Sequence, residues 1–77
     1  MSDEPVLVTV AVERLTLMGR GPVIVVVLDR DCADFTWLMG KIAEVDGVRY
    51  LVSSVESFCL NRHHKGERIG LLVSEAA

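Results

Sequence analysis

Residues 19–28, with the sequence GRGPVIVVVL, predict a tight turn followed by a buried β-strand. The two glycines allow the positive φ angles of such a turn. Pro22 has no amide hydrogen to give a central ladder, so it marks the start of a strand. The next six residues, Val23 to Leu28, are all aliphatic and mostly β-branched, which fits a central strand covered on both faces. This stretch places the chain among β proteins.

Before the turn, apolar residues recur at every second position. Valines at positions 6, 8, 10 and 12 alternate with other residues, as in a strand with one buried face. The apolar positions then become odd-numbered at Leu15 and Leu17. This slip predicts a β-bulge or break near Glu13 and Arg14.

The sequence after the buried strand predicts further strands separated by polar turns. In residues 35–45, Trp37, Leu38, Lys41 and Ile42 have the spacing of one face of a helix. Gly40 and the Asp46-Gly47 turn instead favour a strand that leads into a hairpin. Strands are expected over residues 48–60, with a slip at Ser53 and Ser54, and over residues 69–73. The prediction is an all-β fold, a small closed antiparallel β-barrel over residues 6–74, with flexible ends at 1–5 and 75–77.

Composition narrows the classes of function. The chain has 77 residues, enough for one domain, and 51% of them are hydrophobic. The net charge of −3 argues against DNA and acidic membranes as partners. There is no apolar run long enough to span a bilayer and no basic, apolar leader at the start, so a cytoplasmic location is expected. Cys32 and Cys59 are then expected to be thiols.

Three motifs in order resemble the second domain of elongation factor Tu and related translational GTPases. They are the Gly-Arg-Gly turn at 19–21, the Val-Glu-Ser-Phe strand at 55–58 and the closing segment Gly-Glu-Arg-Ile-Gly-Leu-Leu at 66–72. The resemblance implies a β-barrel that holds the aminoacylated 3′ end of tRNA. It implies a ligand pocket formed by Leu17, Gly19, Val23, Glu56 and Leu72.

The chain also departs from this family. Cys59 occupies the position of a basic residue, and Pro22 that of a threonine. The sequence has no GxxxxGK[ST] phosphate-binding loop, so GTP hydrolysis in the usual way is excluded.

Other candidate residues lie near the C-terminal end. A basic segment formed by Arg62, His63, His64, Lys65 and Arg68 is a candidate surface for a partner. The cysteines and histidines lack the close paired spacing of zinc ligands, so no metal and no cofactor are expected. Cys59 with His63 or His64 could act as nucleophile and base, but no third orienting group is evident.

The sequence therefore favours a binding module over an enzyme. The leading hypothesis is a non-catalytic domain, monomeric or homodimeric, that acts through protein contacts. The alternative is binding of an aminoacyl-tRNA 3′ end or a small adenine-bearing ligand in the barrel pocket.

Overall fold

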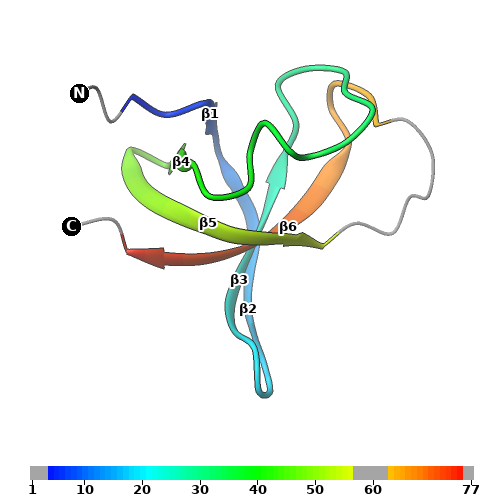
Figure 1. Ribbon diagram of the computed structural model, residues 1–77. Helices are drawn as coiled ribbons and strands as arrows, with labels where there is room; N and C mark the ends of the chain where they lie inside the picture. The colour runs from blue at the N-terminus through cyan, green and yellow to red at the C-terminus, as the bar shows by residue number, and fades with distance from the viewer. Residues whose placement is uncertain (1–3, 57–62, 76–77) are drawn as a thin grey trace.

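The computed structural model describes residues 4–56 and 63–75, which form six β-strands and no helix (Figure 1). The predicted all-β class is confirmed. The strands are β1 (Leu7–Thr9), β2 (Ala11–Leu17), β3 (Gly21–Val27), β4 (Ile42–Val45), β5 (Val48–Glu56) and β6 (Arg68–Glu75). Within this part of the chain, no helix is long and apolar enough to cross a membrane.

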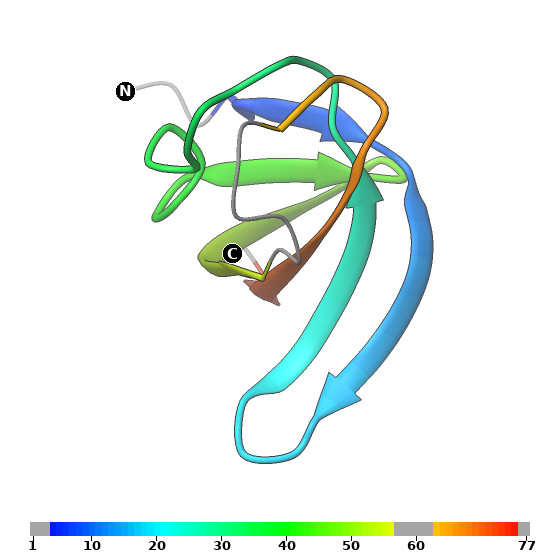
Figure 2. The same ribbon diagram turned by 90° about the vertical axis from the view of Figure 1, so that its right-hand side faces the viewer.

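The strands form one mixed sheet, in the order β1-β4-β5-β6-β3-β2. The prediction of a closed antiparallel barrel is corrected in two respects. The pairing of β1 with β4 is parallel, and β1 and β2 are both edge strands, with no ladder between them in the described residues. The reason lies at Val10, which alone separates β1 from β2. These two strands follow one bent course (Figure 2), so they continue each other and cannot pair side by side.

Side-chain contacts hold this bend against the rest of the sheet. Thr9 donates a hydrogen bond from Oγ1 to the carbonyl of Val27 at 2.6 Å, and its own carbonyl accepts one from the amide of Asp46 at 3.1 Å. The Asp46 carboxylate in turn accepts from the amide of Ala11 at 3.3 Å. The bent course is therefore fixed to β3 and to the β4–β5 hairpin.

The core lies on one face of the curved sheet. In β3, Ile24 and Val26 are buried there, because alternate residues of a strand point to the same face. β6 contributes the next row of buried side chains, and the full cluster is Leu7, Ile24, Val26, Leu28, Leu38, Ala43, Val45, Val52, Ile69, Leu71 and Val73.

Residues 35–41 form successive turns, so the strand predicted over residues 35–45 is wrong before Ile42. The amides of Leu38 and Met39 both donate to the carbonyl of Phe35, at 2.9 and 3.0 Å. Leu38 is fully buried against the core, and Phe35 and Trp37 pack on it. The apolar residues that suggested a strand instead cover one end of the core.

The predicted irregularities and hairpin are confirmed. The β2–β3 register shifts between Ala11 and Glu13, and the β5–β6 register shifts between Val52 and Ser54. Asp46 and Gly47 have φ angles of 52° and 81°. Positive φ at both central residues defines a type I′ turn, whose twist matches that of the two strands it joins.

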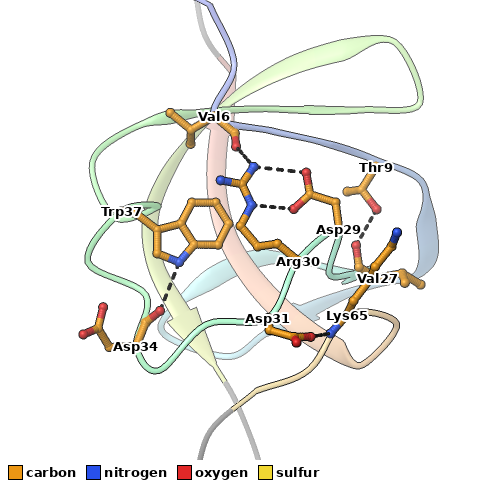
Figure 3. A network of polar contacts seen from close by, with 9 residues as sticks. All are labelled: Val6, Thr9, Val27, Asp29, Arg30, Asp31, Asp34, Trp37 and Lys65. Atoms are coloured by element: carbon orange, nitrogen blue, oxygen red, sulfur yellow. Dashed lines mark hydrogen bonds and ion pairs between the residues drawn. The ribbon is translucent and has the colours of Figure 1, made fainter.

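A network around Arg30 joins the N-terminal segment to the loops at the covered end of the sheet (Figure 3). The guanidinium pairs with both carboxylate oxygens of Asp29, at 2.7 and 3.1 Å, and donates to the carbonyl of Val6 at 2.7 Å. It also stacks over Trp37 at 4.2 Å from the ring centroid. The hydrogen bond with Asp29 raises the pKa of Arg30 above its ordinary value.

Candidate binding groove

A groove of about 500 Å³ lies on the face of the β2–β3 hairpin that points away from the core. Cross-strand pairing explains its walls, because directly paired residues share a face. Leu15 pairs with Val23, and Glu13 pairs with Val25. Since Ile24 faces the core, these four residues face the opposite side. The full lining is Val12, Glu13, Leu15, Leu17, Val23, Val25, Glu56, Arg68, Ile69 and Gly70.

Gly70 deepens the groove because it has no side chain. It pairs with Val25 of β3 and with Glu56 of β5. A Cβ atom placed at Gly70 would lie 3.2 Å from Cγ1 of Val23 and 3.5 Å from Cβ of Glu56. Any larger residue would fill the floor between β3 and the end of β5.

The charged residues of the groove are balanced. Arg20, at the tip of the hairpin, forms an ion pair from Nη1 to Oε1 of Glu56, and both side chains are partly exposed. Glu13 and Arg68 also line the groove, and neither has an ion pair among the residues that the structure describes. The groove therefore combines apolar walls with one ion pair, Arg20–Glu56, and with two further opposite charges, Glu13 and Arg68.

Three of the five pocket residues implied by the family resemblance meet in this groove. Leu17, Val23 and Glu56 line it. Gly19 lies outside its lining, in the turn at the hairpin tip with a φ of 77°, and Leu72 is buried where it pairs with Val23.

Four residues that shape the groove were not predicted to belong to the pocket. Glu13, Arg20 and Gly70 were not predicted as site residues, and Arg68 was predicted as a partner contact but not as part of the pocket; Arg20, Arg68 and Gly70 all lie within the motifs of the resemblance. Their roles depend on which residues face each other across strands. Alternation along a single strand does not carry that information.

The structure separates His63 from the predicted basic surface. His63 is only 5% exposed, and its ring centroid lies 4.4 Å from that of Phe35. Its Nδ1 is 3.8 Å from Oε2 of Glu67. The backbone of His63 also pairs with that of Cys32. A buried, stacked ring offers little surface to a partner, and Arg62 lies outside the described residues.

The other members of that basic segment lie in two places. His64 and Lys65 are exposed beside Asp31, whose Oδ1 accepts a hydrogen bond from the amide of Lys65 at 2.7 Å and lies 4.0 Å from Nδ1 of His64. Arg68 belongs instead to the groove. The acidic neighbour reduces the local positive field of the loop.

A second hollow, of about 330 Å³, lies beside Arg14 and Tyr50. Arg14 donates from Nη1 to the hydroxyl of Tyr50 and from Nη2 to Oδ2 of Asp46, each at 3.3 Å. The hydrogen bond with Tyr50 is the largest cause of a raised pKa at Arg14. These contacts join the open edge β2 to the β4–β5 hairpin, so this arginine has a structural role.

No arrangement typical of metal binding is present in residues 4–56 and 63–75. No three His, Cys, Asp or Glu side chains there come close enough to hold a metal ion. The hypothesis of a Cys59 nucleophile falls outside this part of the chain and stays untested.

Comparison with known proteins gives no relative for this chain. No protein-family model, no curated protein and no solved structure matches it. The likeness to the second domain of elongation factor Tu therefore stands on the three sequence motifs.

Proposed function

We propose that this domain is a non-catalytic binding module that takes a short segment of a partner protein into the groove. The observation that carries the proposal is the combination of apolar walls with accessible, oppositely charged side chains at one hollow. Such a mixture is typical of protein-recognition sites, in which apolar contacts supply affinity and charges select orientation.

The walls are suited to this role. Leu15, Leu17 and Val25 are partly exposed, so a bound side chain would bury apolar surface that water now contacts. Arg68 is exposed and could pair with an acidic group of the partner. The net charge of −3 favours a protein over a nucleic acid as the main partner.

For the same protein we propose a cytoplasmic location, with which the free thiol of Cys32 is compatible.

Selection from a displayed peptide library tests the proposal. We expect peptides that bind the wild-type domain and lose at least tenfold in affinity with Arg68→Glu, because the charge reversal lies in the groove. Lys41→Glu is the matched control, since Lys41 is exposed and does not line the groove. If selected peptides bound both variants equally well, or if none were selected, the proposal would be wrong.

A second candidate is binding of an adenine-bearing RNA end or small ligand in the same groove. The observation that favours it is the meeting of Leu17, Val23 and Glu56, as the family resemblance implies. Amide NMR spectra recorded with an aminoacyl-adenosine analogue test it. Shifts concentrated at these three residues would support it, and unchanged spectra at millimolar analogue would rule it out.

A further inference from the structure

We propose that the groove takes the tip of the β2–β3 hairpin of a second copy of this chain, giving a twofold symmetric dimer. This inference rests on the proposed function, because it uses the same groove and names the partner. It depends on three features: an exposed apolar side chain at the hairpin tip, a groove with apolar walls, and a hairpin that supplies both the tip and part of those walls.

The hairpin tip presents an apolar side chain to solvent. Met18 is 99% exposed, the highest value among the exposed large hydrophobic residues of 4–56 and 63–75. The hairpin projects from the body of the molecule in both views (Figures 1 and 2). Methionine is unbranched and polarizable, so it adapts to irregular apolar surfaces and recurs at binding sites.

The groove can receive such a tip without electrostatic repulsion. Its residues and the adjoining turn carry two acids, Glu13 and Glu56, and two bases, Arg20 and Arg68, so their formal charges sum to zero. Each chain carries a net charge of −3. Contact at this balanced surface therefore lets two like-charged molecules approach, whereas an acidic face would oppose them.

Twofold symmetry makes the contact reciprocal. The same hairpin supplies Met18 at the tip and Leu15 and Leu17 in the groove wall. A twofold axis would therefore place the tip of each copy in the groove of the other. Each hairpin strand has seven residues, a length of roughly 23 Å at about 3.3 Å per residue. In an antiparallel arrangement, the tip of one copy would thus reach the far end of the partner's groove. Val12, which is 42% exposed and lines the groove there, would be covered.

Sedimentation velocity over a concentration series tests the dimer. We expect wild type to dimerise and Met18→Ser to weaken the dimer by roughly a hundredfold or more, because each dimer loses two buried methionine side chains and each is worth roughly tenfold or more. Met39→Ser is the matched control, because Met39 is 45% exposed and does not line the groove. Its dimer should be within about twofold of wild type. A wild type that stays monomeric at 1 mM would overturn the inference, as would equal effects of the two substitutions.

A second measurement fixes the geometry. In a mixture of isotope-labelled and unlabelled chains, intermolecular NOEs should join the Met18 methyl to the methyls of Val12 or Val25, which line the far end of the groove. A dimer without these NOEs would overturn the proposed contact. The peptide selection separates the two failures: a monomeric wild type with Arg68-dependent peptides refutes the dimer alone, whereas a monomeric wild type without such peptides refutes the groove as a protein site.

Discussion

Replacing Arg30 with Ala should unfold the domain at distinctly lower denaturant concentration. One side chain holds Asp29, the carbonyl of Val6 and the ring of Trp37 together (Figure 3). These three partners come from the N-terminal segment, the end of the buried strand and the turns that cover the core. Losing Arg30 therefore loosens three segments that no ladder joins to one another.

The magnitude follows from the separate contacts. The side chains of Arg30 and Asp29 are 47% and 35% exposed, so solvent screening limits their ion pair to at most about 1 kcal/mol. An exposed cation–π contact adds about 0.5–1 kcal/mol, and the hydrogen bond to Val6 about 0.5–1.5 kcal/mol. The expected loss is about 1–3 kcal/mol. A 77-residue domain has about 4–12 kcal/mol in total, so the effect is a large fraction of its stability.

Urea unfolding followed by Trp37 fluorescence, with far-UV circular dichroism as a second probe, measures this loss. With a slope of about 1 kcal/mol per M, the midpoint should fall by about 1–3 M. Arg30→Lys should recover less than half of the loss, because an ammonium cannot form the two-pronged pair or stack as a plane. Arg68→Ala is the control, as Arg68 is exposed and outside this network. A wild-type midpoint for Arg30→Lys, or equal midpoints for Arg30→Ala and Arg68→Ala, would refute the reasoning.

Three further predictions concern the core, a loop carboxylate and a turn. Leu71→Ala should cost about 2–5 kcal/mol, because Leu71 is fully buried, and the same change at Leu51, which is 39% exposed, should cost far less by urea unfolding. The Thr36 hydroxyl and then its amide lower the pKa of Asp34 below 3.8, so the contribution of Asp34 to stability is complete above that value and disappears as pH falls through the folded-state pKa. Thr36→Val should raise the pKa of Asp34 in a carbon-detected NMR titration, and an unchanged pKa would contradict this account. Gly47→Ala should cost about 1–2 kcal/mol in thermal or urea unfolding, since φ is 81° there; a neutral effect would show that the turn can change its conformation.

Local patterns explain most of the strands that the sequence predicted. The β-branched run from Val23 onward forms β3, and the two slips in alternation coincide with shifts of register near Glu13 and Ser54. The Asp46-Gly47 pair forms the expected hairpin turn. These features depend on neighbouring residues, so the sequence alone contains them.

Residues 35–41 show where local patterns mislead. An apolar run with Gly40 fits a strand, but Leu38 is buried as part of a cover over the end of the core. His63 likewise belongs to a polar stretch of sequence and yet is buried against Phe35. In both cases the deciding contact comes from a distant segment, which no short window of sequence contains.

The sequence by itself determined an all-β chain with a turn at residues 19–21 and apolar rows on both sides of β3. Tertiary structure alone decided that the sheet stays open at β1 and β2, because one bent course supplies both edges. It also decided that Arg20 meets Glu56 and that Gly70 leaves the groove floor empty. Strand order and cross-strand register create these contacts between residues far apart in the chain. The alternation of apolar and polar residues along one strand does not specify them, because it is compatible with every possible order of the strands.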